Sequence, residues 1–329
     1  MQFQESESTL HPASHLSRRR FLRATTAAAA AWVGPRFLFA QQQQPAEPIM
    51  VVQARADAAN AKITTQKLRG EISVLLGSGG NIAVLPGREG KLLVDSGIST
   101  SRPQITKALA AISPDPIEGL INTHWHYDHT DGNEWMHAAG ATIVAHDKTR
   151  RRLSTPQEMA IFNAHFPPAP IGALPTKTFL KDDNLTINGR AVFLNHYDPA
   201  HTDTDISVLF ADFDILHTGD TWSNGAYPFI DYSTGGHIDG IIRATTRNLA
   251  TGTGSTILIP GHGPVGNKDQ LSEFQDMIVA VREKVATLKK QGRTVDETVS
   301  AKPTAQYDAK WGTGFVTPEM FTRLVYQGV

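Results

Sequence analysis

Residues 123–129 read Thr-His-Trp-His-Tyr-Asp-His, and this stretch organises the chain. His124, His126, Asp128 and His129 all fall within it. Imidazole nitrogen and carboxylate oxygen are the ligands that zinc and similar divalent metals prefer, so their density here indicates a metal-binding loop. A histidine-rich turn whose hydrogen bonds are satisfied internally is the alternative, and four such side chains at this spacing disfavour it.

The segments on either side place this loop at the end of a strand. Residues 117–122 read as a buried strand followed by a turn, and residues 133–139 read as a short helical segment. Because α/β folds usually carry their sites at the C-terminal ends of strands, the four side chains are expected at such an edge.

Three more candidate ligands follow other strand-like runs. His201 stands in Pro-Ala-His-Thr at 199–202, and Asp220 stands in Thr-Gly-Asp at 218–220. His262 lies between two glycines in Pro-Gly-His-Gly-Pro at 260–264, which lets the backbone approach its neighbours closely. Asp95 also ends a strand-like run, and could be a ligand or a brace.

Short strand-like and helical patterns fill the rest of the chain. Turn signals separate strand-like runs at 63–68, 72–76, 81–85, 91–94, 141–145, 185–187, 191–194, 207–210, 214–217 and 256–259. Helical patterns are predicted over 102–112, most of 149–163, 240–249, 318–326 and from 268 onward, where an apolar stripe has three- and four-residue spacing.

His-x-His-x-Asp-His after a strand resembles the signature of the metallo-β-lactamase superfamily, and the other motifs from Asp95 to His262 follow in that family's order. The resemblance implies an α/β (α+β) fold, a four-layer αββα sandwich of two mixed β-sheets flanked by helices. The strand-rich parts at about 60–145 and 175–260 would form the two sheets.

The resemblance also implies a cofactor of two divalent metal ions, zinc first, with manganese or iron as alternatives. Asp128 would in addition be catalytic, by orienting a hydroxide held between the metals and accepting its proton. Asp95 would brace the ligand loop. The implied ligands are His124, His126 and His201 for the first metal, Asp128, His129 and His262 for the second, and Asp220 as a bridge.

The activity implied is a dinuclear metal-dependent hydrolase that cleaves an ester, thioester, lactone or related bond of a small molecule. Antibiotic-cleaving members usually carry Ser or Cys where this chain has Asp220, so the thioesterase, lactonase, phosphodiesterase and sulfatase branches are favoured. A periplasmic β-lactamase-like amide hydrolase remains an alternative, because the Pro-Ala-His-Thr segment suits it. A non-hydrolytic iron-binding redox protein is another, although residues 265–329 are too few for the flavin domain that such members carry.

The N-terminus has the pattern of an export signal. Residues 17–23 read Ser-Arg-Arg-Arg-Phe-Leu-Arg and resemble the twin-arginine motif. The alanine-rich residues 24–34 are too few to cross a bilayer, which takes about 20 apolar residues, but they match the apolar part of a signal peptide. We expect the twin-arginine export machinery as a partner, cleavage near Ala40 and a periplasmic or exported location. A basic leader or cytosolic tail is the alternative.

Composition excludes some classes of partner and ligand. The formal net charge is −1, and residues 41–329 hold 26 basic and 30 acidic residues, so no basic face for nucleic acid is expected. Absence of cysteine excludes thiolate ligands and disulfides. No stable membrane span is expected in the mature form. The predicted organisation is a signal peptide at 1–40, a linker or frayed first element at 41–60, a metallo-β-lactamase-like domain at 61–265 and a C-terminal helical segment at 266–329 packed on it.

Overall fold

The structure, a computed structural model, describes residues 47–329. The predicted signal peptide and residues 41–46 of the predicted linker lie outside the described residues. These described residues belong to one compact unit, and none of their helices is long and apolar enough to cross a membrane.

The first sheet has seven strands in the order β1-β2-β3-β4-β5-β6-β9. Strands β1 to β4 run antiparallel, whereas β4, β5, β6 and β9 run parallel to one another. The sheet is therefore mixed, as predicted. Its strands are β1 (Thr64–Lys67), β2 (Ser73–Leu76), β3 (Ile82–Leu85), β4 (Lys91–Val94), β5 (Ile117–Ile121), β6 (Thr142–His146) and β9 (Lys177–Phe179).

The second sheet has five strands in the order β10-β11-β12-β13-β14. Strands β10 to β13 are antiparallel, and β14 runs parallel to β13. The C-terminal ends of β11, β13 and β14 consequently meet at one edge of the sheet. These strands are β10 (Asp183–Ile187), β11 (Arg190–His196), β12 (Ile206–Phe210), β13 (Ile215–His217) and β14 (Ile257–Ile259).

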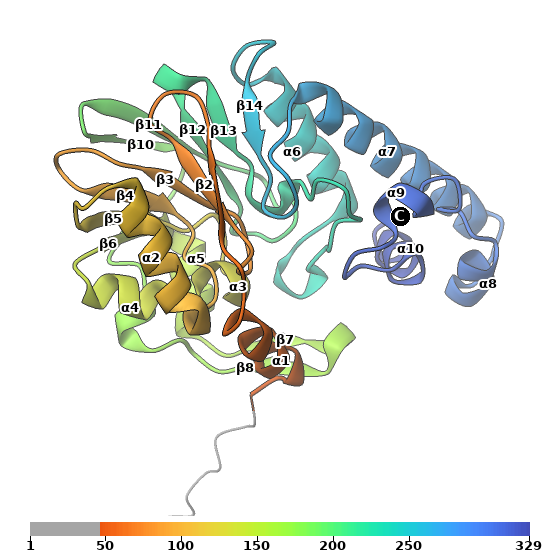
Figure 1. The fold of residues 1–329 in the computed structure, drawn as a ribbon. Coiled ribbons are helices and arrows are strands. Elements are labelled where there is room, and N and C mark those ends of the chain that lie inside the picture. Colours follow the sequence, from red (N-terminus) through yellow and green to blue (C-terminus); the bar gives the residue numbers. More distant parts are fainter. Residues whose placement is uncertain (1–46) are drawn as a thin grey trace, which may run out of the picture. The chain divides into compact units, whose positions relative to one another are not determined.

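The two sheets pack face to face with helices outside them (Figure 1). Alternation along the strands assigns each side chain to a layer: Leu92 and Val94 point into the core between the sheets, while Leu93 points to the outer helices. Helices α2 (Arg102–Ile112) and α4 (Asn133–Ala138) cover the first sheet, and α6 (Ile238–Ala250) and α7 (Lys268–Lys290) cover the second. This is the predicted αββα sandwich.

The C-terminal part is helical and packs on the second sheet. Its apolar stripe, which includes Phe274 and Val281, lies in one core cluster with Leu216 of β13 and Leu258 of β14, as the spacing predicted. Apart from α1 (Ile49–Ala58) at the start of the described residues, the other helices are α3 (Tyr127–Thr130), α5 (Asp147–Ser154), α8 (Val295–Ser300), α9 (Asp308–Trp311) and α10 (Pro318–Gln327). Short 3-10 turns lie at 99–101, 160–162, 171–173, 211–213, 219–221 and 232–234.

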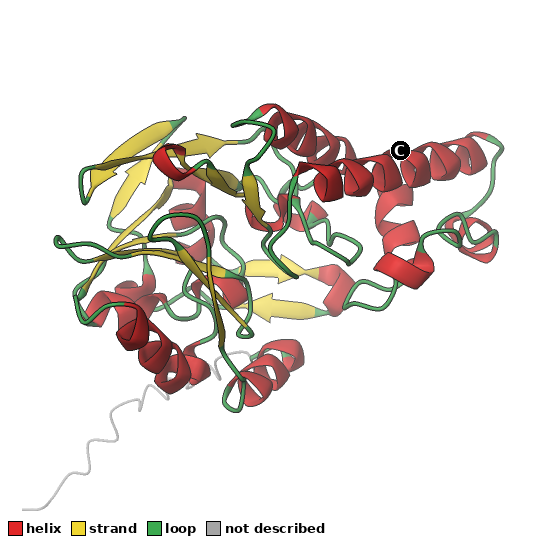
Figure 2. Ribbon diagram, turned by 45° about the horizontal axis from the view of Figure 1, so that its top comes forward, coloured by secondary structure: helices red, strands yellow, loops and turns green. Residues whose placement is uncertain are grey.

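Residues 149–163 differ from the predicted helical pattern. Helix α5 ends at Ser154, and the chain continues as strand β7 (Gln157–Met159), a 3-10 turn and strand β8 (Ala164–Phe166). Pro156 explains the end of the helix, because its ring clashes with the preceding turn and disfavours a helical residue before it. The hairpin of β7 and β8 projects from the sandwich toward the C-terminal helices (Figure 2).

Two further segments depart from the expected organisation. Residues 49–58, expected to be a linker or a frayed first element, form helix α1 (Ile49–Ala58), whose Val51 and Ala58 are buried. Strand β9 lies in the strand-rich part assigned to the second sheet but pairs with β6 at the edge of the first. Both placements depend on packing against distant segments.

Candidate metal centre

All seven predicted ligands lie at the C-terminal ends of strands. The segment after β5 carries four of them, with His124 and His126 in the loop and Asp128 and His129 in α3. The segments after β11, β13 and β14 carry His201, Asp220 and His262. Because β11, β13 and β14 end at one edge of the second sheet, the three loops that follow them lie together. The fold brings these loops next to the segment that follows β5 of the first sheet. Side chains almost 140 residues apart in sequence thus come together.

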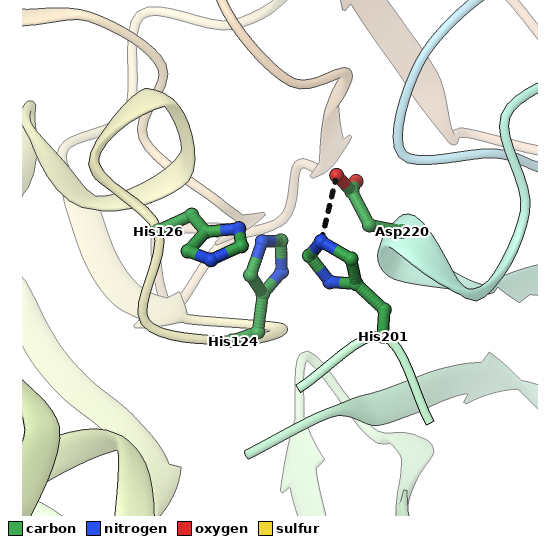
Figure 3. Close-up of side chains that lie close together, drawn as sticks. All are labelled: His124, His126, His201 and Asp220. Carbon is green, nitrogen blue, oxygen red and sulfur yellow. Dashed lines mark ion pairs between the residues drawn. The ribbon is translucent and has the colours of Figure 1, made fainter. Parts of the chain in front are cut away.

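The first group consists of His124, His126, His201 and Asp220, whose candidate ligand atoms all lie within 4.8 Å of one another. The three imidazole rings gather around one point, with centroids 4.6–4.9 Å apart, and Asp220 lies across from them (Figure 3). The closest approach of Asp220 to the rings is the 3.9 Å between its Oδ2 and His201 Nε2.

The second group consists of Asp128, His129 and His262, again with ligand atoms within 4.8 Å. His262 Nε2 lies 3.1 Å from Asp128 Oδ2 and 3.3 Å from His129 Nε2. Asp220 also reaches this group, since its Oδ1 lies 3.1 Å from His129 Nε2 and its Oδ2 lies 3.3 Å from His262 Nε2. The Asp220 carboxylate therefore stands between the two groups.

The unpaired atoms of this cluster fit metal ions. His124 Nε2 and His201 Nε2 are buried without a hydrogen-bond partner. Leaving such atoms unsatisfied in a protein interior costs about 1–3 kcal/mol each, so a buried set of them calls for a ligand. Nitrogen and carboxylate oxygen donors without any thiolate suit zinc, manganese or iron.

Electrostatics in the centre also favour cations. Burial alone would lower the pKa of His262, but the carboxylates of Asp220 and Asp128 raise it to about 10. Burial likewise opposes charge on His129, and Asp220, Asp128 and Asp95 outweigh it, so the pKa of His129 is raised. The pKa of His124 is lowered by burial and by neighbouring imidazoles, which keeps that ring neutral with a free lone pair.

Further carboxylates hold the rings in place. Asp95 accepts hydrogen bonds from Thr123 N and Oγ1 and lies 2.7 Å from His129 Nδ1, so it is a brace of the ligand loop. Asp205 accepts from the backbone N–H groups of His201 and Thr202.

Asp231 is a third brace, and sequence reasoning did not find it. Its Oδ2 lies 3.0 Å from His126 Nε2, which leaves Nδ1 of that ring for the first group. Asp231 sits in a loop without a strand-end motif, so no local signal identified it.

Gly261 makes room for the Asp220 carboxylate. A Cβ atom at this position would lie 1.8 Å from Asp220 Oδ1, far inside contact distance. Gly263 is similarly required because its φ is +88° and a Cβ would lie 2.1 Å from Asn224 O. The glycines on both sides of His262 therefore allow the close approach that the sequence predicted.

A cavity of about 540 Å³ opens over the two groups. Five of the seven candidate ligands line it, including Asp128, Asp220 and His262. Its walls come from α1, the β7–β8 hairpin and two loops, at 222–231 and 312–317. The volume lies within the range of about 300–1,000 Å³ that small-molecule sites occupy.

Comparisons with known proteins agree with this geometry. A family described as "Metallo-beta-lactamase superfamily" matches residues 76–265, which span every strand-end motif from Asp95 to His262. A curated relative, the hydroxyacylglutathione hydrolase of Polaromonas sp., is 27% identical over 165 residues, covering 49% of this chain and 54% of the relative. The chain thus spans about half the length of that relative.

Solved structures share the fold at low sequence identity. A metallo-beta-lactamase from Pontibacter korlensis has a TM-score of 0.54 at 18% identity, covering 66% of this chain and 99% of that one. The sec-alkylsulfatase Pisa1 from Pseudomonas sp. has a TM-score of 0.60 at 15% identity, covering 83% of this chain and 51% of that one. At these identities the likeness concerns the fold alone.

Proposed function

The chain belongs to the metallo-β-lactamase superfamily, and from that premise we propose that it is a hydrolase dependent on two divalent metal ions, with zinc as the first candidate. The family consists mostly of hydrolases, and the proposal adds the number of metals and the bond cleaved. The first ion would be held by His124, His126 and His201, and the second by Asp128, His129 and His262. The bond would be an ester, thioester or lactone.

The position of Asp220 carries this proposal. Its two oxygens reach His129 and His262 in one group and face His201 in the other. Two cations bound close together repel each other, and a carboxylate shared between them offsets part of that repulsion. One metal alone would leave either the buried nitrogens of the first group or the three side chains of the second without a role.

The chain's own residues would position the reactants and move the proton. Divalent cations lower the pKa of a bound water toward 7 and polarise a carbonyl. Asp128 borders the cavity, and its carboxylate can accept a proton from the attacking water. The water oxygen joins the acyl carbon, the C–O or C–S bond breaks, and a proton passes to the leaving alcohol or thiol.

Elemental analysis together with an activity panel tests the proposal. Protein purified without chelator and reconstituted with zinc, manganese or iron should hold two ions per chain. It should hydrolyse members of a panel of esters, thioesters and lactones assayed beside β-lactams and phosphodiesters. One ion or none after reconstitution would overturn the dinuclear assignment, and hydrolysis of β-lactams alone would overturn the assignment of the bond.

A further inference from the structure

We propose that the substrate carries an uncharged, apolar arm, and that a row of three phenylalanines, Phe229, Phe162 and Phe315, selects it. The inference rests on the proposed hydrolytic function and adds the chemical class of the substrate. It follows from the origin of the cavity walls, from the aromatic side chains in them and from the charges that face the cavity.

Three segments distant in sequence close the cavity around the candidate metal centre. Helix α1 contributes Met50 and Ala54 besides the polar Gln53 and Asp57, and it lies next to the β7–β8 hairpin (Figure 1). The hairpin contributes Met159 and Phe166 and the loop before α10 contributes Val316, all of them apolar. The wall is therefore suited to a hydrocarbon chain, because burying apolar surface is favourable and needs no specific partner.

The three phenylalanines form a continuous row from the metal centre to the surface. The Phe229 ring lies 6.1 Å from the His126 ring and 6.2 Å from the His201 ring. Phe162 lies 5.3 Å from Phe229 and 5.4 Å from Phe315, which is 62% exposed. All three line the cavity, so a substrate held at the metals would extend along them.

The charges that face the cavity disfavour an anionic arm. Among the described residues that line it, none is Lys or Arg, and the charged ones besides the imidazoles are Asp57, Asp128 and Asp220. Arg55 of α1 is turned away and binds Asp131, with 3.1 Å between Arg55 Nε and Asp131 Oδ2. A carboxylate or phosphate remote from the metals would thus lose water without gaining a cation, which is costly.

The cavity should favour neutral substrates over acylated glutathione. Acylated glutathione is the substrate that the name of the Polaromonas relative indicates for that protein. A glutathione thioester carries carboxylates at a distance from its scissile bond, and in this cavity they would face apolar and acidic side chains. An alkanoyl ester or an alkyl-substituted lactone places only hydrocarbon there.

A series of p-nitrophenyl esters measures the preference. We expect kcat/KM of the metal-loaded mature protein to rise from acetate to hexanoate by roughly twofold to fourfold per methylene. The fourfold figure corresponds to full burial of a methylene, which is worth about 0.8 kcal/mol. The matched substrate is the mono-p-nitrophenyl ester of adipic acid, which ends in a carboxylate. It should fall at least ~10-fold below the hexanoate.

Substitutions of Phe162 identify the wall that is responsible. Phe162→Ala should flatten the dependence on chain length, and Phe162→Lys should raise the adipate ester relative to the hexanoate because it supplies the missing cation. The matched control is Phe193→Ala, which removes the same side chain from β11, where it is 40% exposed and outside the cavity lining. It should leave the preference unchanged.

Binding of a neutral dye separates this inference from the proposed function. N-phenyl-1-naphthylamine should fluoresce on the wild-type protein and on Phe193→Ala, and should bind Phe162→Lys several-fold more weakly. Dye binding of this kind without hydrolysis of any ester would overturn the proposed function and leave the apolar cavity standing. Hydrolysis with no preference for chain length, or with the adipate ester preferred by the wild type, would overturn the inference alone.

Discussion

At the scale of single residues, Asp220 has the largest expected effect, because its carboxylate stands between both groups of candidate ligands. We predict that Asp220→Ala lowers kcat by at least ~100-fold, since the second metal and stabilisation of transition-state charge are lost together. Circular dichroism should show an intact fold, and elemental analysis should show less than two ions. Full ester or thioester hydrolysis by Asp220→Ser or Asp220→Cys would contradict the bridging role.

Gly261 is the second residue on which the centre depends. Gly261→Ala should displace the Asp220 carboxylate, because the added Cβ would lie 1.8 Å from its Oδ1. We expect loss of metal and of most activity in a protein that still folds, measured by elemental analysis and kcat. The matched control is Gly254→Ala, where no atom lies within 4 Å of the added Cβ. Equal metal content in both variants would show that Asp220 adjusts without cost.

At the scale of elements, helix α1 is held against the segment that carries four candidate metal ligands and against the start of α2. Arg55 binds Asp131 through two nitrogens, Thr100 Oγ1 donates to Arg55 O at 2.6 Å, and Gln104 Nε2 donates to Ala59 O at 2.7 Å. Since α1 forms one wall of the cavity, its attachment should affect substrate binding more than the chemical step.

We therefore predict that Arg55→Ala raises KM for the hexanoate ester several-fold with little change in kcat. Hydrogen exchange should be faster at the α1 amides in this variant. Arg323→Ala is the control, because Arg323 makes its ion pairs with Asp296 and Glu319 on C-terminal helices. A fall in kcat with unchanged KM would argue against a wall that acts only in binding.

Strands β6 and β11 meet at a stacked histidine pair that links the two sheets. The rings of His146 and His196 lie 3.8 Å apart at an interplanar angle of 10°. Burial, together with the neighbouring imidazole of His196, lowers the pKa of His146 to about 4, and burial also lowers the pKa of His196. Both rings are therefore neutral in the folded protein at pH 7.

This pair should make stability fall in acid. An unfolded histidine has a pKa of about 6.5, so between that value and about 4 the unfolded chain binds more protons than the folded one. We predict that His146 contributes about 1–2 kcal/mol less stability at pH 5 than at pH 7. Urea unfolding of the wild type and of His146→Phe measures it, and the variant should show a smaller loss. Equal losses would assign the acid sensitivity to other titrating residues, such as the candidate metal ligands, which both proteins share.

At the scale of the whole molecule, we propose that the chain is exported in a folded state by the twin-arginine route. The proposal rests on Arg18 and Arg19 ahead of the alanine-rich residues 24–34. Replacing both arginines by lysine should leave the precursor in the cytoplasm, as judged by cell fractionation and immunoblotting. The same exchange at Arg150 and Arg151 in α5 is the control and should not affect export. Periplasmic protein from the Arg18→Lys, Arg19→Lys variant would show that the signal is of another kind.

The family resemblance carried by the sequence motifs implied the αββα sandwich, which the structure confirms. It also named the seven candidate ligands, which the structure brings together in two groups. Metal ligands must be particular residue types, so local motifs identify the candidate ligands His124, His126, Asp128, His129, His201, Asp220 and His262. Strands buried between two layers can also be recognised from sequence, because each is a short apolar run with turn residues at both ends. Helix α2 even has the predicted bounds, 102–112.

Tertiary structure decided the shape and the chemistry of the cavity. Any apolar side chain can build its wall, so Phe162, Phe229 and Phe315 carry no sequence signal. Their row exists only because α5 ends before Pro156, the β7–β8 hairpin forms and the C-terminal loop reaches it. Asp231 was missed for the same reason, since its role depends on the distant ring of His126. A metal ligand must be one of a few residue types, so a short stretch of sequence is enough to recognise it. A cavity wall is restricted only in volume and polarity, and these are set by distant segments that come together when the chain folds.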